Sequence, residues 1–127
     1  MTSRVALVTG GTGGIGTAIC QGLAKSGHRV ATNYRHEGKA KTWQAEQKAL
    51  GFDFTIVPGD VSDAQSAAEM VKAVEATLGP VDILVNNAGI TRDKLLKDMA
   101  VEDWDAVLNL NLRATFLCCK HATPHMV

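Results

Sequence analysis

The chain has 127 residues, which is enough for one compact domain but not for two. Hydrophobic residues make up 46% of the chain, so a packed core can form. Lys plus Arg and Asp plus Glu each number 13, and this formal net charge of zero argues against binding to nucleic acid or anionic membranes through bulk charge.

The cysteines and the lack of long apolar runs bear on the cellular compartment. Cys20, Cys118 and Cys119 are odd in number and form no Cys-x-x-Cys motif, so we expect neither a disulfide framework nor a zinc site. We interpret all three as small apolar residues that fill helix interfaces. The first residues lack a signal-peptide pattern, and no run approaches the ~18 apolar residues of a membrane span. We therefore expect a soluble, cytoplasmic protein.

The first two predicted units each join a strand to a helix. An apolar run over Val5–Val8 ends in a cluster of glycines, which is typical of a strand buried on both faces of a parallel sheet. A second strand is expected over residues 29–33. Gly27 and Gly51 are placed to end the two helices. These helices are marked by residues at helical spacing, which are Ile15, Ala18, Ile19, Gly22 and Leu23 in the first and Ala40, Trp43, Gln47 and Leu50 in the second.

The next two units repeat the alternation. A third helix is expected to begin at Ser62, the N-cap of a Ser-Asp-Ala-Gln capping box, and to end at Gly79. A last, long helix begins near Val101 or Glu102. The strands are marked by Phe54, Ile56 and Val57 and by residues 81–85. The apolar faces of the helices carry Ala67, Met70, Val71, Val74 and Leu78, and then Trp104, Val107, Leu108, Leu112 and Phe116.

The chain thus alternates strand and helix four times. Such an order gives right-handed crossovers and a parallel sheet with helices on both faces. We predict one α/β domain over residues 1–127, with a doubly wound parallel sheet that stops after its fourth strand and the following long helix.

The segment Thr9 to Gly16, Thr-Gly-Gly-Thr-Gly-Gly-Ile-Gly, connects the first strand to the first helix. A helix N-terminus offers unpaired N–H groups and partial positive charge, and a phosphate can reach them where no Cβ stands in the way. We assign Gly10 to the tight turn, Gly14 to the approach of phosphate and Gly16 to helix packing. The segment predicts a site for the pyrophosphate of a dinucleotide, and a glycine-rich turn without a ligand is the alternative.

The end of the second strand favours NADP over NAD. In NAD sites an acid about 20 residues beyond the turn binds the ribose hydroxyls. Here the strand ends in Asn33, Tyr34 and Arg35, and the first carboxylate is Glu37. Arg35 can pair with a 2′-phosphate, and Asn33 and Tyr34 can add neutral contacts. We therefore expect NADP(H), with a solvated Arg35 as the alternative.

These features and three further motifs resemble the short-chain dehydrogenases/reductases. The family's Thr-Gly-x-x-x-Gly-x-Gly matches Thr9 to Gly16, and its Asn-Asn-Ala-Gly matches Asn86 to Gly89. Its acid after the third strand matches Asp60, and its asparagine in the long helix matches Asn111. The matches occur in order along the whole chain. The resemblance implies a Rossmann-type fold and an NADP-dependent oxidoreductase.

The resemblance also implies roles for single residues. Asp60 and Val61 would meet the adenine, and Asp93 would contact the substrate. Asn111 would act in catalysis by holding a water on a proton relay behind the catalytic lysine, whereas a satisfied buried amide or a helix bend is the alternative. The expected cofactor-binding residues are Gly10, Thr12, Gly13, Gly14, Ile15, Gly16, Asn33, Tyr34, Arg35, Asp60, Val61, Asn87, Ala88, Gly89, Ile90 and Thr91.

A closer resemblance is to the 3-oxoacyl thioester reductases, whose segment after Asn-Asn-Ala-Gly is similar to residues 89–93. Residues 13–20 and 47–53 look like the acetoacetyl-CoA reductase branch. Residues 95–96 look more like the acyl-carrier-protein branch, and Asp98 stands where acetoacetyl-CoA reductases often have lysine. The resemblance implies NADPH-dependent reduction of a 3-oxoacyl thioester, with acetoacetyl-CoA favoured and an acyl-carrier-protein substrate as the alternative.

The long helix is apolar on nearly every side, which is typical of a helix buried on several faces. The family forms dimers and tetramers by packing this helix against a partner chain. The resemblance therefore implies a homo-oligomer, a tetramer in the full-length enzyme, with an acyl thioester as small-molecule substrate and no nucleic-acid or membrane partner.

The chemistry of the family also needs a Ser and a Tyr-x-x-x-Lys beyond this helix, with the tyrosine as general acid. Tyr34 is the single tyrosine, and Gly38 rather than lysine stands four residues on. We expect these 127 residues to bind the cofactor without reducing a ketone, so a non-catalytic dinucleotide-binding module is the alternative function. A methyl-transfer enzyme is disfavoured because the second strand does not end in an acid. His121 and His125 lack the intervening glutamate of a metal motif, so no metal site is expected.

Overall fold

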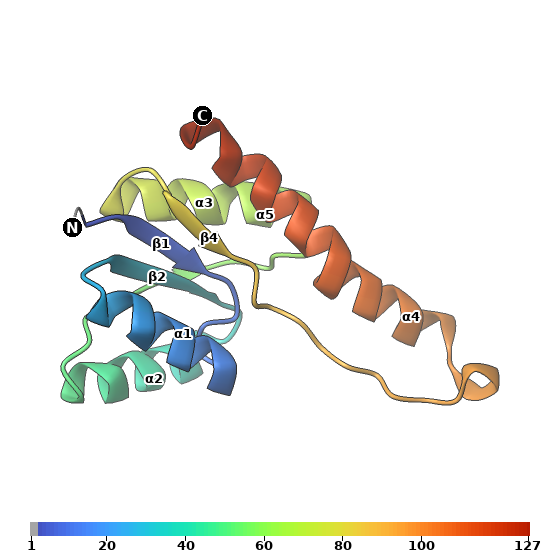
Figure 1. The fold of residues 1–127 in the computed structure, drawn as a ribbon. Helices are drawn as coiled ribbons and strands as arrows, with labels where there is room; N and C mark the ends of the chain where they lie inside the picture. The colour runs from blue at the N-terminus through green and yellow to red at the C-terminus, as the bar shows by residue number, and fades with distance from the viewer. Residues whose placement is uncertain (1–2) are drawn as a thin grey trace.

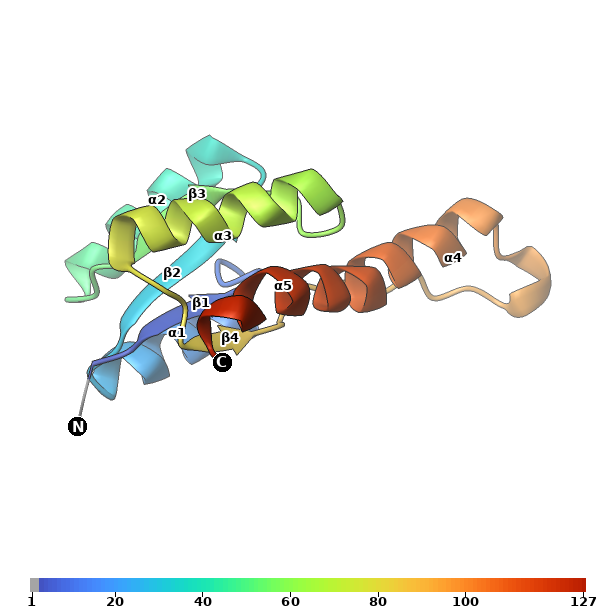
Figure 2. The ribbon, with the colours of Figure 1, turned by 90° about the horizontal axis from the view of Figure 1, so that it is seen from above.

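The computed structural model describes residues 3–127 and contains a four-stranded sheet in the order β3-β2-β1-β4, with every neighbouring pair parallel. Helices α1 and α2 cover one face and α3 and α5 cover the other (Figures 1 and 2), which confirms the doubly wound, Rossmann-type prediction. The elements are β1 (Val5–Val8), α1 (Gly14–Lys25), β2 (Arg29–Tyr34), α2 (Glu37–Ala49), β3 (Thr55–Pro58), α3 (Ala64–Leu78), β4 (Ile83–Val85), η1 (Leu96–Asp98), α4 (Val101–Leu108), η2 (Asn109–Arg113), α5 (Ala114–Ala122) and η3 (Thr123–His125).

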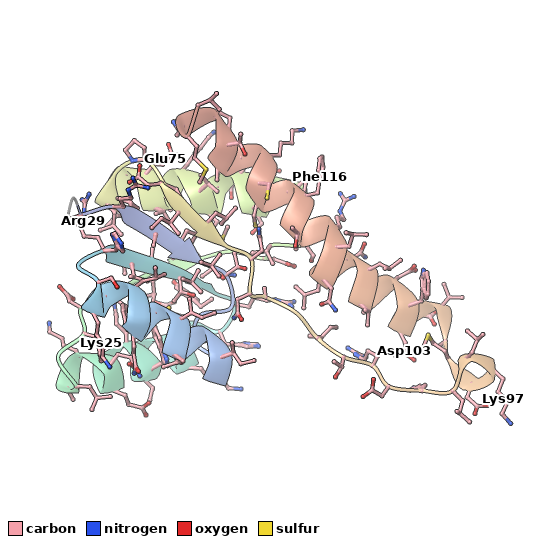
Figure 3. All side chains as sticks on the ribbon, viewed as in Figure 1. Lys25, Arg29, Glu75, Lys97, Asp103 and Phe116 are labelled. Atoms are coloured by element: carbon pink, nitrogen blue, oxygen red, sulfur yellow. The ribbon has the colours of Figure 1, made fainter. Side chains whose placement is uncertain are left out.

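The long last helix begins at Val101, as predicted, but a π-helical turn, η2, separates α4 from α5. Figure 1 shows α4 and the loop before it projecting away from the sheet, while α5 lies beside α3. Trp104, Leu112 and Phe116 are 54%, 66% and 61% exposed, and Figure 3 shows Phe116 on the side turned away from the sheet. Within residues 3–127 this apolar face is therefore not buried as expected, because no element of the sheet domain reaches it.

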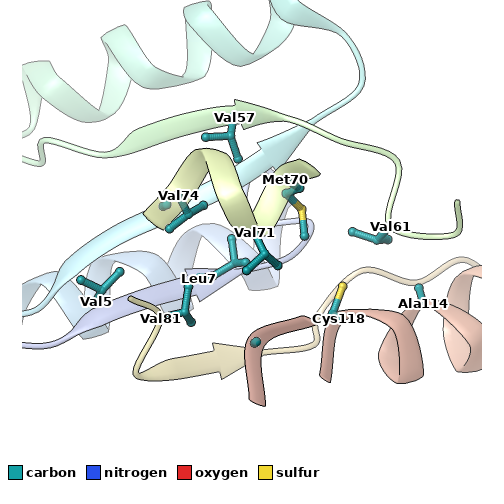
Figure 4. Packing of buried hydrophobic residues seen from close by; sticks show 12 residues of the cluster. Val5, Leu7, Val57, Val61, Met70, Val71, Val74, Val81, Ala114 and Cys118 are labelled. Atoms are coloured by element: carbon teal, nitrogen blue, oxygen red, sulfur yellow. The ribbon is translucent and has the colours of Figure 1, made fainter. Parts of the chain in front are cut away.

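Strand β1 lies in the middle of the sheet and is at most 1% exposed along its length. Val5 and Leu7 belong to the cluster under α3 and α5 (Figure 4), and Ala6 and Val8 belong to the cluster under α1 and α2. A strand covered on both faces has no solvated side, so its sequence is continuously apolar rather than alternating. The burial of β1 thus fixes the two layers of helices.

The cap of α3 differs from the prediction by one residue. Asp63, not Ser62, is the N-cap, and its Oδ2 accepts the N–H of Ser66 at 2.8 Å. The Ser62 hydroxyl instead donates to Asp60 Oδ1 at 2.6 Å. Aspartate and serine are comparable N-caps. Because the Ser62 side chain is bound to Asp60, Asp63 is the residue that caps α3.

Other markers lie at the edges of their predicted elements. Leu50 is the C-cap of α2 and is exposed, and the fourth strand begins at Ile83 rather than at residue 81. Cys119 is also exposed, contrary to its assignment as filler. Cys20 and Cys118 are buried as predicted, and burial raises the pKa of both thiols to about 11, so they stay protonated.

Helix α1 approaches the turn after β1 closely because residue 16 has no side chain. A Cβ at Gly16 would overlap the carbonyl oxygen of Gly10 and lie 2.6 Å from the Cα of Gly11 and 2.8 Å from Asn87 Nδ2. At Gly22, in the same helix, the described residues place no atom within 4 Å of such a Cβ. The two glycines therefore form a matched pair, one required by packing and one not.

We expect Gly16→Ala to lower the free energy of unfolding by about 1–3 kcal/mol, the typical cost of overpacking. Gly22→Ala should raise it by roughly 0.5–1 kcal/mol, because alanine favours the helix over glycine. Urea unfolding followed by circular dichroism measures both changes. Equal effects of the two substitutions would contradict the packing role of Gly16.

Candidate functional site

A cavity of about 590 Å³ opens at the carboxyl ends of the strands. The chain adds β2 and β3 on one side of β1 and then crosses to add β4 on the other, and this reversal leaves a crevice between β1 and β4. All of the predicted cofactor-binding residues except Ile90 and Thr91 line the cavity, together with Leu110, which was not predicted. Segments from four strand ends therefore meet in one place.

The glycine turn is held by side chains from two neighbouring strands. Gly10 has a φ of +65°, and its N–H donates to Asn33 Oδ1 at 2.9 Å while its carbonyl accepts Asn87 Nδ2 at 3.0 Å. The N–H of Gly11 donates to Thr32 Oγ1 at 2.8 Å. Asn33 lines the cavity, but both ends of its amide are used within the protein, since Nδ2 donates to the Gly59 carbonyl. It therefore acts on the shape of the turn, a role that the sequence did not reveal.

Thr9 joins the turn to the segment after β4. Its Oγ1 accepts the N–H groups of Asn87 and Ala88, each at 3.1 Å, and the residue is only 2% exposed. The sequence pattern did not predict this contact or the one between Gly11 and Thr32. The available signal was the presence of two buried threonines at the ends of apolar strands, where polar side chains need partners.

The first turn of α1 faces the cavity. Gly13, the N-cap, has no side chain to bind the first N–H groups of the helix, and Gly14 to Thr17 contains no acidic residue. Ile15 is 75% exposed here, so it borders the cavity rather than marking the buried face of the helix. The arrangement leaves donors and partial positive charge available to an anion.

Arg35 and Asp60 stand beside each other at the ends of β2 and β3. Arg35 Nη2 lies 4.0 Å from Asp60 Oδ2, and the side chains are 67% and 36% exposed, so the pair is weak. The hydroxyl of Ser62 holds the pKa of Asp60 below its usual value, and Arg35 adds to this effect. Asp60 is thus an ionised acceptor, and Arg35 remains able to bind another anion.

The loop between β4 and α4 carries the remaining predicted residues. Ile90, Thr91 and Asp93 line a second cavity, of about 290 Å³, against α4. Asp103 on α4 faces this loop (Figure 3) and pairs with Lys94 Nζ at 3.1 Å and Arg92 Nη1 at 3.4 Å. The hydrogen bond from Lys94 lowers the pKa of Asp103, so the carboxylate that ties the loop to α4 is charged.

Asn111 lies in the π-helical turn and is exposed, not buried in an apolar stripe. Its Nδ2 donates to the Ile90 carbonyl and its Oδ1 accepts the Ile90 N–H, both at 2.9 Å. The two hydrogen bonds of this side chain therefore hold the loop against the helix. A satisfied amide at a helix irregularity describes this geometry, and the role of Asn111 in a water relay stays a prediction.

Of the two histidines near the end of the chain, His121 lies on α5 and His125 on η3. His125 Nε2 is 3.0 Å from Glu75 Oε1 on α3. Across residues 3–127 we find no group of three His, Cys, Asp or Glu side chains arranged to hold a metal. The same residues contain no helix with the length and apolar character needed to cross a membrane.

Comparison with characterised proteins gives related sequences of about twice this length. The chain is 52% identical over 127 residues to nodulation protein G of Azospirillum brasilense and 47% identical over 127 residues to acetoacetyl-CoA reductase of Cupriavidus necator. It is 44% identical over 126 residues to a 3-oxoacyl-[acyl-carrier-protein] reductase of Staphylococcus aureus. These matches cover 98–99% of this chain, but the chain spans only about half the length of each relative.

The chain is also similar to solved structures of a ketoreductase and a dehydrogenase. A variant of actinorhodin polyketide ketoreductase with NADPH matches with a TM-score of 0.92 and 36% identity, over 98% of this chain and 48% of that one. A gluconate 5-dehydrogenase from Burkholderia cenocepacia with NADP and tartrate matches with a TM-score of 0.89 and 35% identity, over 99% and 49%. The model of the family described as "short chain dehydrogenase" matches residues 4–127. The chain therefore belongs to the short-chain dehydrogenase/reductase family of oxidoreductases.

Proposed function

We propose that this chain supplies the cofactor-binding portion of an NADPH-dependent reductase that converts acetoacetyl-CoA to 3-hydroxybutyryl-CoA. The observation that carries the proposal is the single cavity shared by the open first turn of α1, Arg35 and the segment Asn87 to Gly89. A bound dinucleotide supplies the hydride. The residues of this chain bind and orient it.

Two features that line the cavity and suit anions support the choice of NADP(H). The first turn of α1 suits a pyrophosphate, because its N–H groups have no partner within the helix. Arg35 suits a 2′-phosphate, since its pair with Asp60 is long and solvated. Asp60 and Val61 then lie where an adenine would contact the end of β3. NADPH and NADP accompany the two structural neighbours described above, which supports the same choice.

The names of the relatives support a 3-oxoacyl thioester substrate. The acetoacetyl-CoA reductase is 47% identical and the acyl-carrier-protein enzyme is 44% identical, so CoA is the preferred carrier and acyl-carrier protein the alternative. Ile90, Thr91 and Asp93 border the second cavity next to the cofactor site, where they would contact the nicotinamide ring and the substrate.

We expect Arg35→Ala to weaken NADPH binding by about 10- to 100-fold, the range for losing hydrogen bonds between charged groups, and to leave NADH binding unchanged. Lys25→Ala removes a cation from the last residue of α1 (Figure 3), at the other end of the helix from the residues that line the cavity, and serves as the control. Calorimetric titration with each dinucleotide measures these affinities. Equal affinities for NADPH and NADH that Arg35→Ala does not change would refute the assignment.

The reductase proposal is tested by joining residues 1–127 to the remaining half of the Cupriavidus necator acetoacetyl-CoA reductase. We expect this chimera to consume NADPH with acetoacetyl-CoA and to do so more slowly with acetoacetyl-acyl-carrier protein. NADPH absorbance reports the rate, and circular dichroism reports the fold. A folded chimera that reduces neither thioester would contradict the proposal, and a preference for the acyl-carrier protein would select the alternative carrier.

We further propose that the protein forms a homo-oligomer through the long helix. Its large apolar side chains at every fourth position remain exposed, and apolar patches of this kind mark protein interfaces. The side chains are Trp104, Leu108, Leu112 and Phe116.

Light scattering of the purified protein should therefore give a mass of at least a dimer. Leu112→Arg is expected to shift the mass toward the monomer, because the interface would then have to bury an unpaired charge. Leu50→Arg, at an equally exposed leucine beside α2, should leave the mass unchanged. A monomeric wild-type protein would disprove this assembly.

A further inference from the structure

One side-chain hydrogen bond reaches from α2 to the glycine turn. Trp43 is 7% exposed, and its Nε1 donates to Thr17 Oγ1 at 3.0 Å. Thr17 Oγ1 lies 2.6 Å from the carbonyl oxygen of Gly13 and 3.3 Å from that of Gly11. The indole of α2 is thus connected through one hydroxyl to two carbonyl groups of the turn.

The chemistry of the indole and the hydroxyl group determines which of them donates the hydrogen bond. An indole N–H can only donate, whereas a hydroxyl has one proton to donate and lone pairs to accept. Because Trp43 donates to Thr17 Oγ1, the hydroxyl proton is left to point toward the turn. The N–H of Thr17 donates to the Gly13 carbonyl as well, at 2.8 Å. Thr17 therefore holds this carbonyl with two donors.

The orientation of the Gly13 carbonyl decides where the next N–H group points. The carbonyl of Gly13 and the N–H of Gly14 belong to one planar peptide unit, so fixing one fixes the other. Gly14 is the first residue of α1, its N–H has no partner within the helix, and it lines the cavity. Glycine residues have wide conformational freedom. A hydrogen bond from a side chain outside the turn therefore restricts the orientations that this peptide can adopt.

Trp43 is itself fixed by stacking. Its ring lies 5.3 Å from the ring of Phe54 with an interplanar angle of 16°, and Phe54 stacks in turn on Phe52 at 5.5 Å. Such aromatic pairs contribute more stability than the burial of their surface area alone. This stacking therefore restrains the indole ring, so that its N–H stays directed at Thr17.

We infer that Trp43 is a positioning residue for the dinucleotide pyrophosphate and acts through Thr17 on the peptide between Gly13 and Gly14. The inference rests on the proposed function, since it assigns the pyrophosphate to the first turn of α1. Trp43 does not line the cavity, so its effect on the ligand is indirect.

The test uses the purified protein and two ligands, NADPH and adenosine 2′-monophosphate. The second ligand carries the phosphate proposed for Arg35 but has no pyrophosphate. Trp43→Phe keeps an aromatic ring on Phe54 and removes the N–H. We expect it to weaken NADPH binding by about three- to tenfold, the usual range for one hydrogen bond, and to leave binding of adenosine 2′-monophosphate unchanged.

Two more variants separate the contact from general packing. Thr17→Val removes the hydroxyl, so adding Trp43→Phe to it should weaken NADPH binding no further. Gln21→Leu removes the other side-chain hydrogen bond between α1 and α2, from Gln21 Nε2 to Gln47 Oε1 at 2.8 Å, away from the turn. We expect this control to bind both ligands like the wild-type protein.

The outcomes separate the inference from the function beneath it. A wild-type protein that binds neither ligand overturns the proposed function and the inference with it. If the wild-type protein binds NADPH, the inference alone is overturned by an unchanged Trp43→Phe variant, by equal loss of both ligands, by multiplying effects in the double variant, or by a Gln21→Leu variant as weak as Trp43→Phe.

Discussion

The structure depends on how the polar groups at the end of a completely buried strand are satisfied. β1 has helices over both faces and a strand on each side, and Thr9, where the chain leaves the sheet, is only 2% exposed. Buried N–H and C=O groups need partners, and here side chains supply them, from Asn33 on β2 and Asn87 after β4. These contacts hold the turn in place, and the N–H groups in the first turn of α1, which have no partner within the helix, face the cavity.

Much of the fold follows from local signals in the sequence. The unbroken apolar run of β1 predicts burial on both faces, and Gly27 and Gly51 end their helices with φ near +90° and +95°. The cap at Asp63 was missed because two good N-cap residues are adjacent and only tertiary contacts choose between them. The π-helical turn at η2 was missed because apolar residues spaced by four fit an unbroken helix equally well.

The site was predictable to the extent that topology brings distant segments together. Carboxyl ends of parallel strands meet at one edge, so motifs that follow four strands had to converge there once the order of elements was known. The supporting contacts were not predictable. Thr32 binds Gly11, and Trp43 binds Thr17, across more than 20 residues with no periodic pattern to mark them. Glycine motifs show where a ligand can approach, whereas these contacts decide the shape it meets.

The glycine turn and the loop after β4 differ in the kind of contacts that hold them in place. The cofactor end is built on buried strands and satisfied amides, so its geometry belongs to the core. The loop after β4 is held instead by Asn111 and by ion pairs of Asp103 with two cations that are about half exposed, and such pairs contribute little alone. The apolar face of the adjoining helix stays open as well. The position of the loop therefore depends also on what packs against the exposed face of that helix, whereas the shape of the glycine turn is set by contacts within the sheet.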